Sequence, residues 1–106
     1  MIQLVLTTVA NPQQAEDLAQ ALVRSALAAC VTQLPKAKST YIWDGKLETS
    51  DEILLLIKTH ANKLQELKVW LESHHPYDCP EVLAFNAVDG LEAYMHWVAQ
   101  QTSQNC

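Results

Sequence analysis

The feature that most constrains this chain is a run of five apolar residues, Ile53-Leu54-Leu55-Leu56-Ile57. Successive side chains of a β-strand point to opposite faces of the sheet, so a strand with one solvated face alternates apolar and polar residues. This run does not alternate. It therefore predicts a strand that is buried on both of its faces.

The first 30 residues predict a strand followed by a helix. Residues 2–9 are rich in β-branched side chains, which is typical of a strand. Asn11 offers an N-cap, and Pro12 suits the first position of a helix. An Ala-rich apolar stripe at helical spacing then predicts a helix that ends near Ala29, with Ala15, Leu18, Ala19, Leu22 and Ala26 on its buried side.

A β-hairpin is predicted around Asp44-Gly45. The segments 30–34 and 39–43 are typical of strands, and Pro35 between them predicts an edge position or a bulge. Asp-Gly favours a two-residue turn whose central residues both have positive φ. The returning strand would run from Lys46 through Thr59, with Trp43 opposite Lys46 and Tyr41 opposite Glu48.

The remaining sequence predicts a helix over about 61–73, a loop with two prolines, a strand over 81–88 and a helix over 90–101. The last helix would turn Leu91, Tyr94, Met95 and Val98 inward. The order βαββαβ, followed by a helix, indicates one α+β domain (1–106) with a ferredoxin-like sandwich, in which two helices cover one face of a four-stranded antiparallel sheet. The last helix is too short to cover all of the other face, so the residues at 53–57 favour a subunit interface there.

Composition excludes several classes of protein. The 106 residues are 49% apolar and 18% charged, which does not fit a disordered chain, and the net charge of −5 does not fit a nucleic-acid binder. No apolar run approaches the ~20 residues of a membrane span, and the N-terminus does not resemble a signal peptide. The three cysteines form no CxxC pair, which favours reduced thiols and a cytoplasmic location. We expect Cys30 to be buried, Cys106 to be accessible and Cys79 to lie between these extremes.

Side chains that can bind metals are densest in the loop 74–81. Imidazole and thiolate are typical ligands of copper and zinc. Pro76 favours an extended conformation at His75, so the adjacent imidazoles of His74 and His75 should point in different directions. The alternative is that this loop is only a stiff connection that caps one helix and braces the next strand. The candidate residues are His74, His75, Tyr77, Asp78, Cys79 and Glu81.

Several motifs give the chain a resemblance to the CutA family of divalent-cation tolerance proteins. They are Leu27-Ala28-Ala29-Cys30-Val31, Tyr41-x-Trp43-Asp44-Gly45-Lys46, Ile57-Lys58-Thr59, His74-His75-Pro76-Tyr77-x-x-Pro80-Glu81 and Tyr94-x-x-Trp97. The motifs follow the family's order over nearly the whole chain. The resemblance implies a ferredoxin-like fold, a homotrimer similar to that of the PII signalling proteins, and no established enzymatic activity.

The resemblance also implies two functions. In the first, Cu²⁺ or a similar divalent ion binds weakly at His74 and Glu81, because Thr7 stands where the family's copper site has a cysteine. In the second, the trimer is a sensor or scaffold that binds a small anionic ligand or a protein in clefts between subunits. The cleft residues would be Trp43, Lys58, His75, Tyr77, Glu81 and Trp97. A third interpretation is that these residues only build the trimer.

Overall fold

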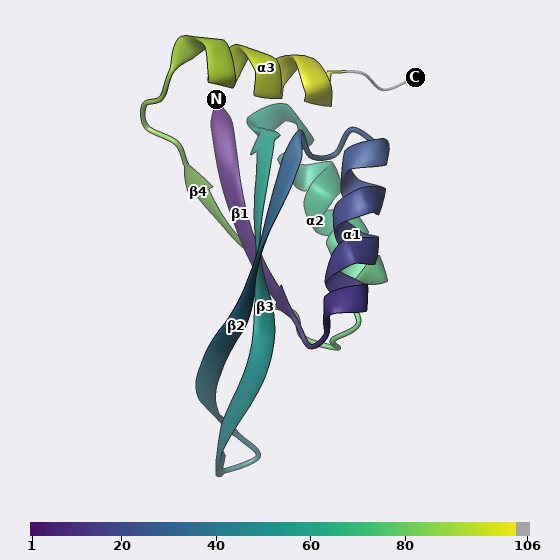
Figure 1. The fold of residues 1–106 in the computed structure, drawn as a ribbon, viewed down its shortest axis with the longest axis vertical. Helices are drawn as coiled ribbons and strands as arrows, with labels where there is room; N and C mark the ends of the chain where they lie inside the picture. Colours follow the sequence, from purple (N-terminus) through teal and green to yellow (C-terminus); the bar gives the residue numbers. More distant parts are fainter. Residues whose placement is uncertain (104–106) are drawn as a thin grey trace.

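A computed structural model of the protein describes residues 1–103 and shows the predicted order of elements. The strands β1 (Ile2–Val9), β2 (Cys30–Trp43), β3 (Lys46–His60) and β4 (Leu83–Asn86) form one sheet with the order β2-β3-β1-β4. All pairs of neighbouring strands are antiparallel. The helices α1 (Pro12–Arg24) and α2 (Leu64–His74) lie on one face, and a short 3-10 helix η1 (Ala61–Lys63) precedes α2 (Figure 1). The ferredoxin-like prediction is therefore confirmed.

The core lies between the sheet and α1 and α2. Val5 and Val9 of β1 are fully buried, as are Leu55 and Ile57 of β3. They pack in one cluster with apolar side chains of the two helices, among them Leu18, Leu22, Leu67 and Leu71. This cluster accounts for one face of the 53–57 run.

The other face of that run is not covered within one chain. Leu54 and Leu56 are only half-buried. By the alternation of the strands, the residues paired with them also point away from α1 and α2. We call this surface the open face; its apolar side chains are Leu4, Leu6, Leu34, Leu54, Leu56, Leu83 and Phe85.

The hairpin of β2 and β3 extends beyond the two helices, so its tip projects from the body of the molecule (Figure 1). Asp44 and Gly45 have φ angles of 51° and 75°, as the predicted turn requires. Trp43 is opposite Lys46 and Tyr41 is opposite Glu48, which confirms the predicted register. β2 is continuous past Pro35, and a register irregularity between Leu34 and Ala37 absorbs the interruption.

Several predicted boundaries are wrong. Helix α1 ends at Arg24 rather than near Ala29, because Ala26 takes a left-handed conformation with φ 61° and the next amide, Leu27 N–H, bonds back to the Leu22 carbonyl. Strand β3 continues one residue further, to His60. Strand β4 is confined to four exposed edge residues, Leu83–Asn86. The last helix, α3, is Glu92–Thr102.

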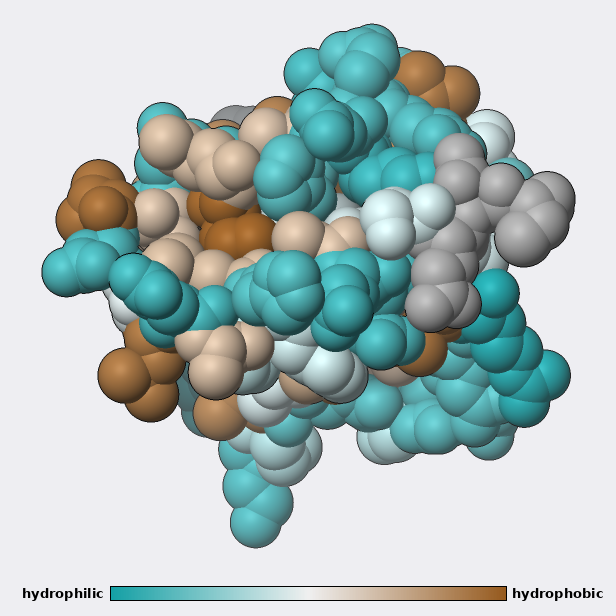
Figure 2. Space-filling view, turned by 90° about the horizontal axis from the view of Figure 1, so that it is seen from above, coloured by the Kyte–Doolittle hydropathy of each residue, from teal (hydrophilic) through white to brown (hydrophobic). Residues whose placement is uncertain are grey.

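Helix α3 lies across one end of the sheet rather than along the open face (Figure 1). Its Val98 is buried and belongs to a small cluster with Ile2 and Ala29, whereas Leu91 is 81% exposed and Tyr94 is also exposed. The expected inward position is therefore right for Val98 and wrong for Leu91 and Tyr94. Seen from the α3 end, apolar side chains reach the surface in separate patches among hydrophilic ones (Figure 2).

The positions of two cysteines differ from expectation. Cys30 is half-buried rather than buried, because it lies on the open face opposite Lys58. Cys79 is exposed. The third, Cys106, lies outside the described residues. Within residues 1–103, no helix has the length and apolarity that a membrane crossing requires.

Candidate functional site

His75 holds the loop that follows α2. Its backbone N–H caps α2 by donating to the Leu71 carbonyl, and its side chain is 8% exposed. Nδ1 accepts the Tyr77 backbone N–H at 3.0 Å, so the ring proton of the neutral imidazole is on Nε2. Nε2 lies 2.9 Å from the Thr8 carbonyl oxygen and 3.0 Å from the Thr7 hydroxyl. Both ring nitrogens are therefore engaged, and His75 braces the loop against β1.

A buried carboxylate continues this polar network. Tyr77 donates its hydroxyl proton to Glu52 Oε2 at 2.7 Å, and Glu52 is 7% exposed. Burial alone would raise the pKa of the Glu52 carboxyl, but hydrogen bonds from Ser39, Tyr77 and Thr8 outweigh it and leave the pKa below its usual value. Burial, together with Glu52, raises the pKa of Tyr77. Glu52 is therefore anionic and Tyr77 neutral at pH 7.

An open groove of about 1130 Å³ lies between the hairpin and this loop. Trp43, Tyr41 and Tyr77 supply aromatic side chains, and Cys79 lines it as well. Five carboxylates also line the groove, and none of its lining residues within 1–103 is a Lys or Arg, although Lys38 lies 3.1 Å from Asp51. The carboxylates are Glu48, Asp51, Glu52, Asp78 and Glu81. The groove in one chain is therefore suited to a cation.

His74 is placed differently from His75, as expected from Pro76. Its ring is exposed and stacks on Trp70, with the centroids 4.2 Å apart and the planes 9° from parallel. Nδ1 lies 2.9 Å from the Trp70 carbonyl oxygen, so this nitrogen carries the ring proton and donates it. Ser73 Oγ is also within 3.0 Å of Nδ1. The lone pair of Nε2 is left available to a metal.

The residues implied for a copper site are not gathered around one point. Thr7 is fully buried and contacts His75 rather than His74. Glu81 is exposed and lines the groove. Among residues 1–103, no three His, Cys, Asp or Glu side chains cluster closely enough to hold a metal ion. One chain therefore offers His74 and Glu81 without a third ligand.

The residues implied for a cleft fall into two groups within one chain. Trp43, Tyr77 and Glu81 line the groove, while His75 supports it from behind. Lys58 lies on the open face, where its ammonium group donates to Thr32 Oγ1 and is 3.7 Å from Cys30 Sγ. Lys58 is paired with Leu4, and the groove residue Thr8 is four positions further along β1, a separation of roughly 13 Å.

Trp97 belongs to the second group. It lies on α3 with its ring 5.8 Å from that of Tyr94, and burial together with the charge of Cys30 raises the pKa of Tyr94. Trp97, Tyr94 and Cys30 thus lie at the Lys58 end of the open face. The sequence motifs identified both groups, but only the register of β1 and β3 shows that a single chain keeps them apart.

Sequence reasoning missed Glu52 and Thr8 as members of the site. Both lie at strand positions, and Glu52 directly precedes the apolar run that begins at Ile53. A carboxylate next to a buried strand is a signal for a hydrogen-bonded acid. Its partner Tyr77 could not be inferred, because the two residues are 25 positions apart.

Comparison with known proteins identifies the family. Residues 3–101 match the family described as CutA1 divalent ion tolerance protein. The chain belongs to this family. It is 42% identical over 94 residues to the divalent-cation tolerance protein CutA of Yersinia pestis (strain Pestoides F), covering 89% of this chain and 79% of that protein. It is 38% identical over 101 residues to the mouse protein CutA, covering 95% of this chain but only 57% of the mouse protein.

Solved structures of the CutA1 family have the same fold. CutA from Xylella fastidiosa is 42% identical and has a TM-score of 0.93, with 95% of this chain and 97% of that chain covered. The divalent cation tolerance protein from Thermus thermophilus is 37% identical with a TM-score of 0.92, covering 96% and 99% of the two chains.

The stability of the fold should fall as the pH is lowered below 6.5, partly through His75. Burial lowers the pKa of His75 from its ordinary 6.5, although the Thr8 carbonyl and Glu52 act in the opposite direction. Between the folded-state pKa and 6.5, the unfolded chain binds more protons than the folded one, so acid favours unfolding there. Urea unfolding at pH 7.5 and at pH 5.5 measures this loss, and His75→Gln should make it smaller. His60 is the comparison, because burial also lowers its pKa. If His60→Gln reduced the loss of stability and His75→Gln did not, the effect would belong to His60.

Proposed function

We propose that this member of the CutA1 family is a divalent-cation tolerance protein that forms a homotrimer and binds Cu²⁺ or a similar divalent ion through His74 and Glu81. The observation that carries the metal proposal is the state of His74. Its Nδ1–H donates to a backbone carbonyl, and its Nε2 has no hydrogen-bond partner among residues 1–103. Imidazoles that bind metals commonly have this arrangement, because the outer hydrogen bond fixes the tautomer and the orientation of the ring.

The electrostatics of the groove support a cation as the ligand. Five carboxylates line the groove in one chain, and Glu52 among them is buried and anionic. A cleft lined by one sign of charge raises the local concentration of ions of the opposite sign. With only two side-chain ligands, His74 and Glu81, binding should be weak, unless a neighbouring subunit completes the site.

The open face supports the homotrimer. Leu34, Leu83 and Phe85 on this face are 43%, 51% and 48% exposed, and Trp43 and Leu47 at the hairpin tip are 60% and 72% exposed. Apolar areas of this kind on a soluble domain mark interaction sites. Burial against two further copies of the chain would cover these side chains and would supply the second cover that the 53–57 run requires. The number of subunits comes from the family resemblance.

A second candidate is a PII-like trimeric sensor or scaffold that binds a small anionic ligand or a protein in clefts between subunits. The observation that favours it is Lys58. Among residues 1–103, the Lys58 ammonium has no carboxylate within 4.0 Å and bonds only to Thr32 and Cys30. If assembly brought Lys58 and Trp97 of one subunit to the Trp43, Tyr77 and Glu81 of another, the cleft would contain a cation able to pair with an anion.

The proposal includes a cytoplasmic location and no catalytic role. The cysteine pattern supports the first part, because neither Cys30 nor Cys79 is in a disulfide. The sequence supports the second, since it contains no phosphate-binding Gly-rich loop and no nucleophile elbow.

Calorimetric titration with Cu²⁺ tests the metal proposal. The wild-type protein should bind at pH 7, and His74→Ala should weaken binding at least tenfold, since the loss of one of two ligands leaves too little affinity. His96→Ala, which removes another exposed imidazole on α3, is the matched control and should bind as the wild type does. If His74→Ala retained full affinity, the cleft-ligand function would be preferred.

The buried position of Thr7 leads to a second prediction about copper affinity. Because its side chain is buried against His75, we expect Thr7→Cys to leave copper affinity within about twofold of the wild type, in contrast to what the family's copper site implies. The same calorimetric titration measures it. A large gain in affinity would show that the thiol reaches the metal and that the loop rearranges around it.

A further inference from the structure

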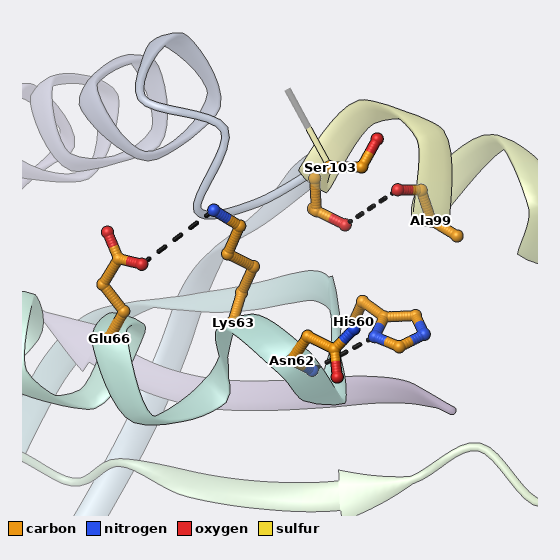
Figure 3. A pocket seen from close by; sticks show the side chains of 7 residues that line it. His60, Asn62, Lys63, Glu66, Ala99 and Ser103 are labelled. Carbon is orange, nitrogen blue, oxygen red and sulfur yellow. Dashed lines mark hydrogen bonds and ion pairs between the residues drawn. The ribbon is translucent and has the colours of Figure 1, made fainter. Parts of the chain in front are cut away.

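A second cavity, of about 450 Å³, lies apart from the groove, between the start of α2 and the last turn of α3. Its lining includes His60, Asn62, Lys63, Glu66 and Ser103 (Figure 3). These residues take no part in the metal or cleft proposals. Cavities of a few hundred Å³ are typical of small-molecule sites.

Lys63 is the exceptional residue of this cavity. It is only 7% exposed, although lysines are almost never fully buried unless they are paired. Its ammonium nitrogen is 3.9 Å from Glu66 Oε1, which is an ion pair but too long for a hydrogen bond. Among residues 1–103 the ammonium has no hydrogen-bond acceptor. A lysine that is almost wholly buried, with an ammonium group that bonds to no acceptor among these residues, thus lines the cavity.

One other donor is available at the same cavity. The His60 ring is already engaged, because its Nδ1 accepts the Asn62 backbone N–H at 3.1 Å and its Nε2 lies 3.1 Å from the N-terminal ammonium group of Met1. Burial and the charge of the N-terminus lower the pKa of His60, which keeps the ring neutral at pH 7. The Asn62 side-chain amide is exposed and makes no hydrogen bond to any of the described residues. The start of α2, whose dipole favours an anion, follows directly after Lys63.

We propose that this cavity binds a small molecule through a singly charged carboxylate, with the Lys63 ammonium as its main partner and the Asn62 side-chain amide as a further donor. In Figure 3 the Lys63 side chain rises between Glu66 on one side and Ser103 and Ala99 on the other. Glu66 would repel a second negative charge, as would the net charge of −5 of the chain. A monoanionic carboxylate therefore fits better than a doubly charged phosphate.

The test is a titration of the whole protein with sodium acetate. NMR monitors the titration through the signals of the Asn62 side-chain amide and the Ser103 backbone amide. Sodium chloride at equal ionic strength is the reference, and sodium phosphate is a second arm. Acetate should give saturable shifts at these signals, and Lys63→Met should weaken its binding at least tenfold. Lys68→Met, which removes an exposed lysine of the same helix, should change the affinity by less than twofold.

Met can occupy the space of the buried lysine stem, so the Lys63→Met variant should fold. Asn62→Ala, at an exposed position, is a second variant and should weaken acetate binding two- to fivefold. Shifts with acetate no larger than those with chloride would overturn the proposal, as would full affinity in Lys63→Met and Asn62→Ala. Phosphate binding tenfold tighter than acetate would overturn the carboxylate assignment.

Discussion

Leu56→Glu is expected to convert the proposed trimer to a monomer. Leu56 lies at the centre of the open face, between Leu6 on β1 and Thr32 on β2. Assembly would bury residue 56 of every subunit. A carboxylate at this position would lose its hydration without gaining a partner. In the single chain Leu56 is only half-buried, so the fold itself should tolerate the charge. Light scattering on a size-exclusion column measures the mass, and far-UV circular dichroism checks that the variant is folded.

Val69→Glu is the matched control for this substitution. Val69 is an apolar residue of α2 that is 56% exposed and lies outside the open face. The same change of residue type should leave the trimer mass unaltered there. If folded Leu56→Glu kept the trimer mass, the open face could not be the interface.

His75→Ala is expected to destabilise the protein by about 2–4 kcal/mol, because it removes the imidazole that pairs with the part-buried Tyr77 N–H and the buried Thr8 carbonyl. It also removes a side chain that is 8% exposed, so a cavity adds to the loss. Urea unfolding at a fixed protein concentration measures the change, since the stability of an oligomer depends on concentration.

The neighbouring His74→Ala separates this structural role from metal binding. His74 is exposed, and its main contacts are the stacking on Trp70 and one hydrogen bond to a carbonyl, so its loss should cost less than about 1 kcal/mol. The two variants should therefore show opposite patterns: His75→Ala loses stability, whereas His74→Ala loses copper. Equal destabilisation by both would contradict the division of roles between the two imidazoles.

Local chemistry explains which parts of the fold could be predicted. The Asp44-Gly45 turn and the pairing around it follow from backbone preferences within a few residues, and both are confirmed. The end of α1 could not be predicted, because the left-handed residue that stops the helix is an alanine, Ala26, and not the glycine or asparagine that usually signals such a stop. The 53–57 run indicated two-sided burial, and one chain supplies cover for only one side.

The candidate site was predictable in its residues and not in its arrangement. Pro76 was enough to predict that His74 and His75 diverge. The place of Lys58 follows from counting along β3, since it shares its face with Leu54 and Leu56. The buried Glu52–Tyr77 pair joins β3 to the loop after α2, and such a long-range contact has no signature in the local sequence.

The mass of the wild-type protein in solution is the most direct test of the central claim, that copies of this chain assemble through the open face. Static light scattering across a range of protein concentrations at pH 7 gives this mass without any label or substitution. The account predicts a particle of three times the chain mass of 11.9 kDa that persists on dilution. A mass of one chain at all concentrations would contradict it.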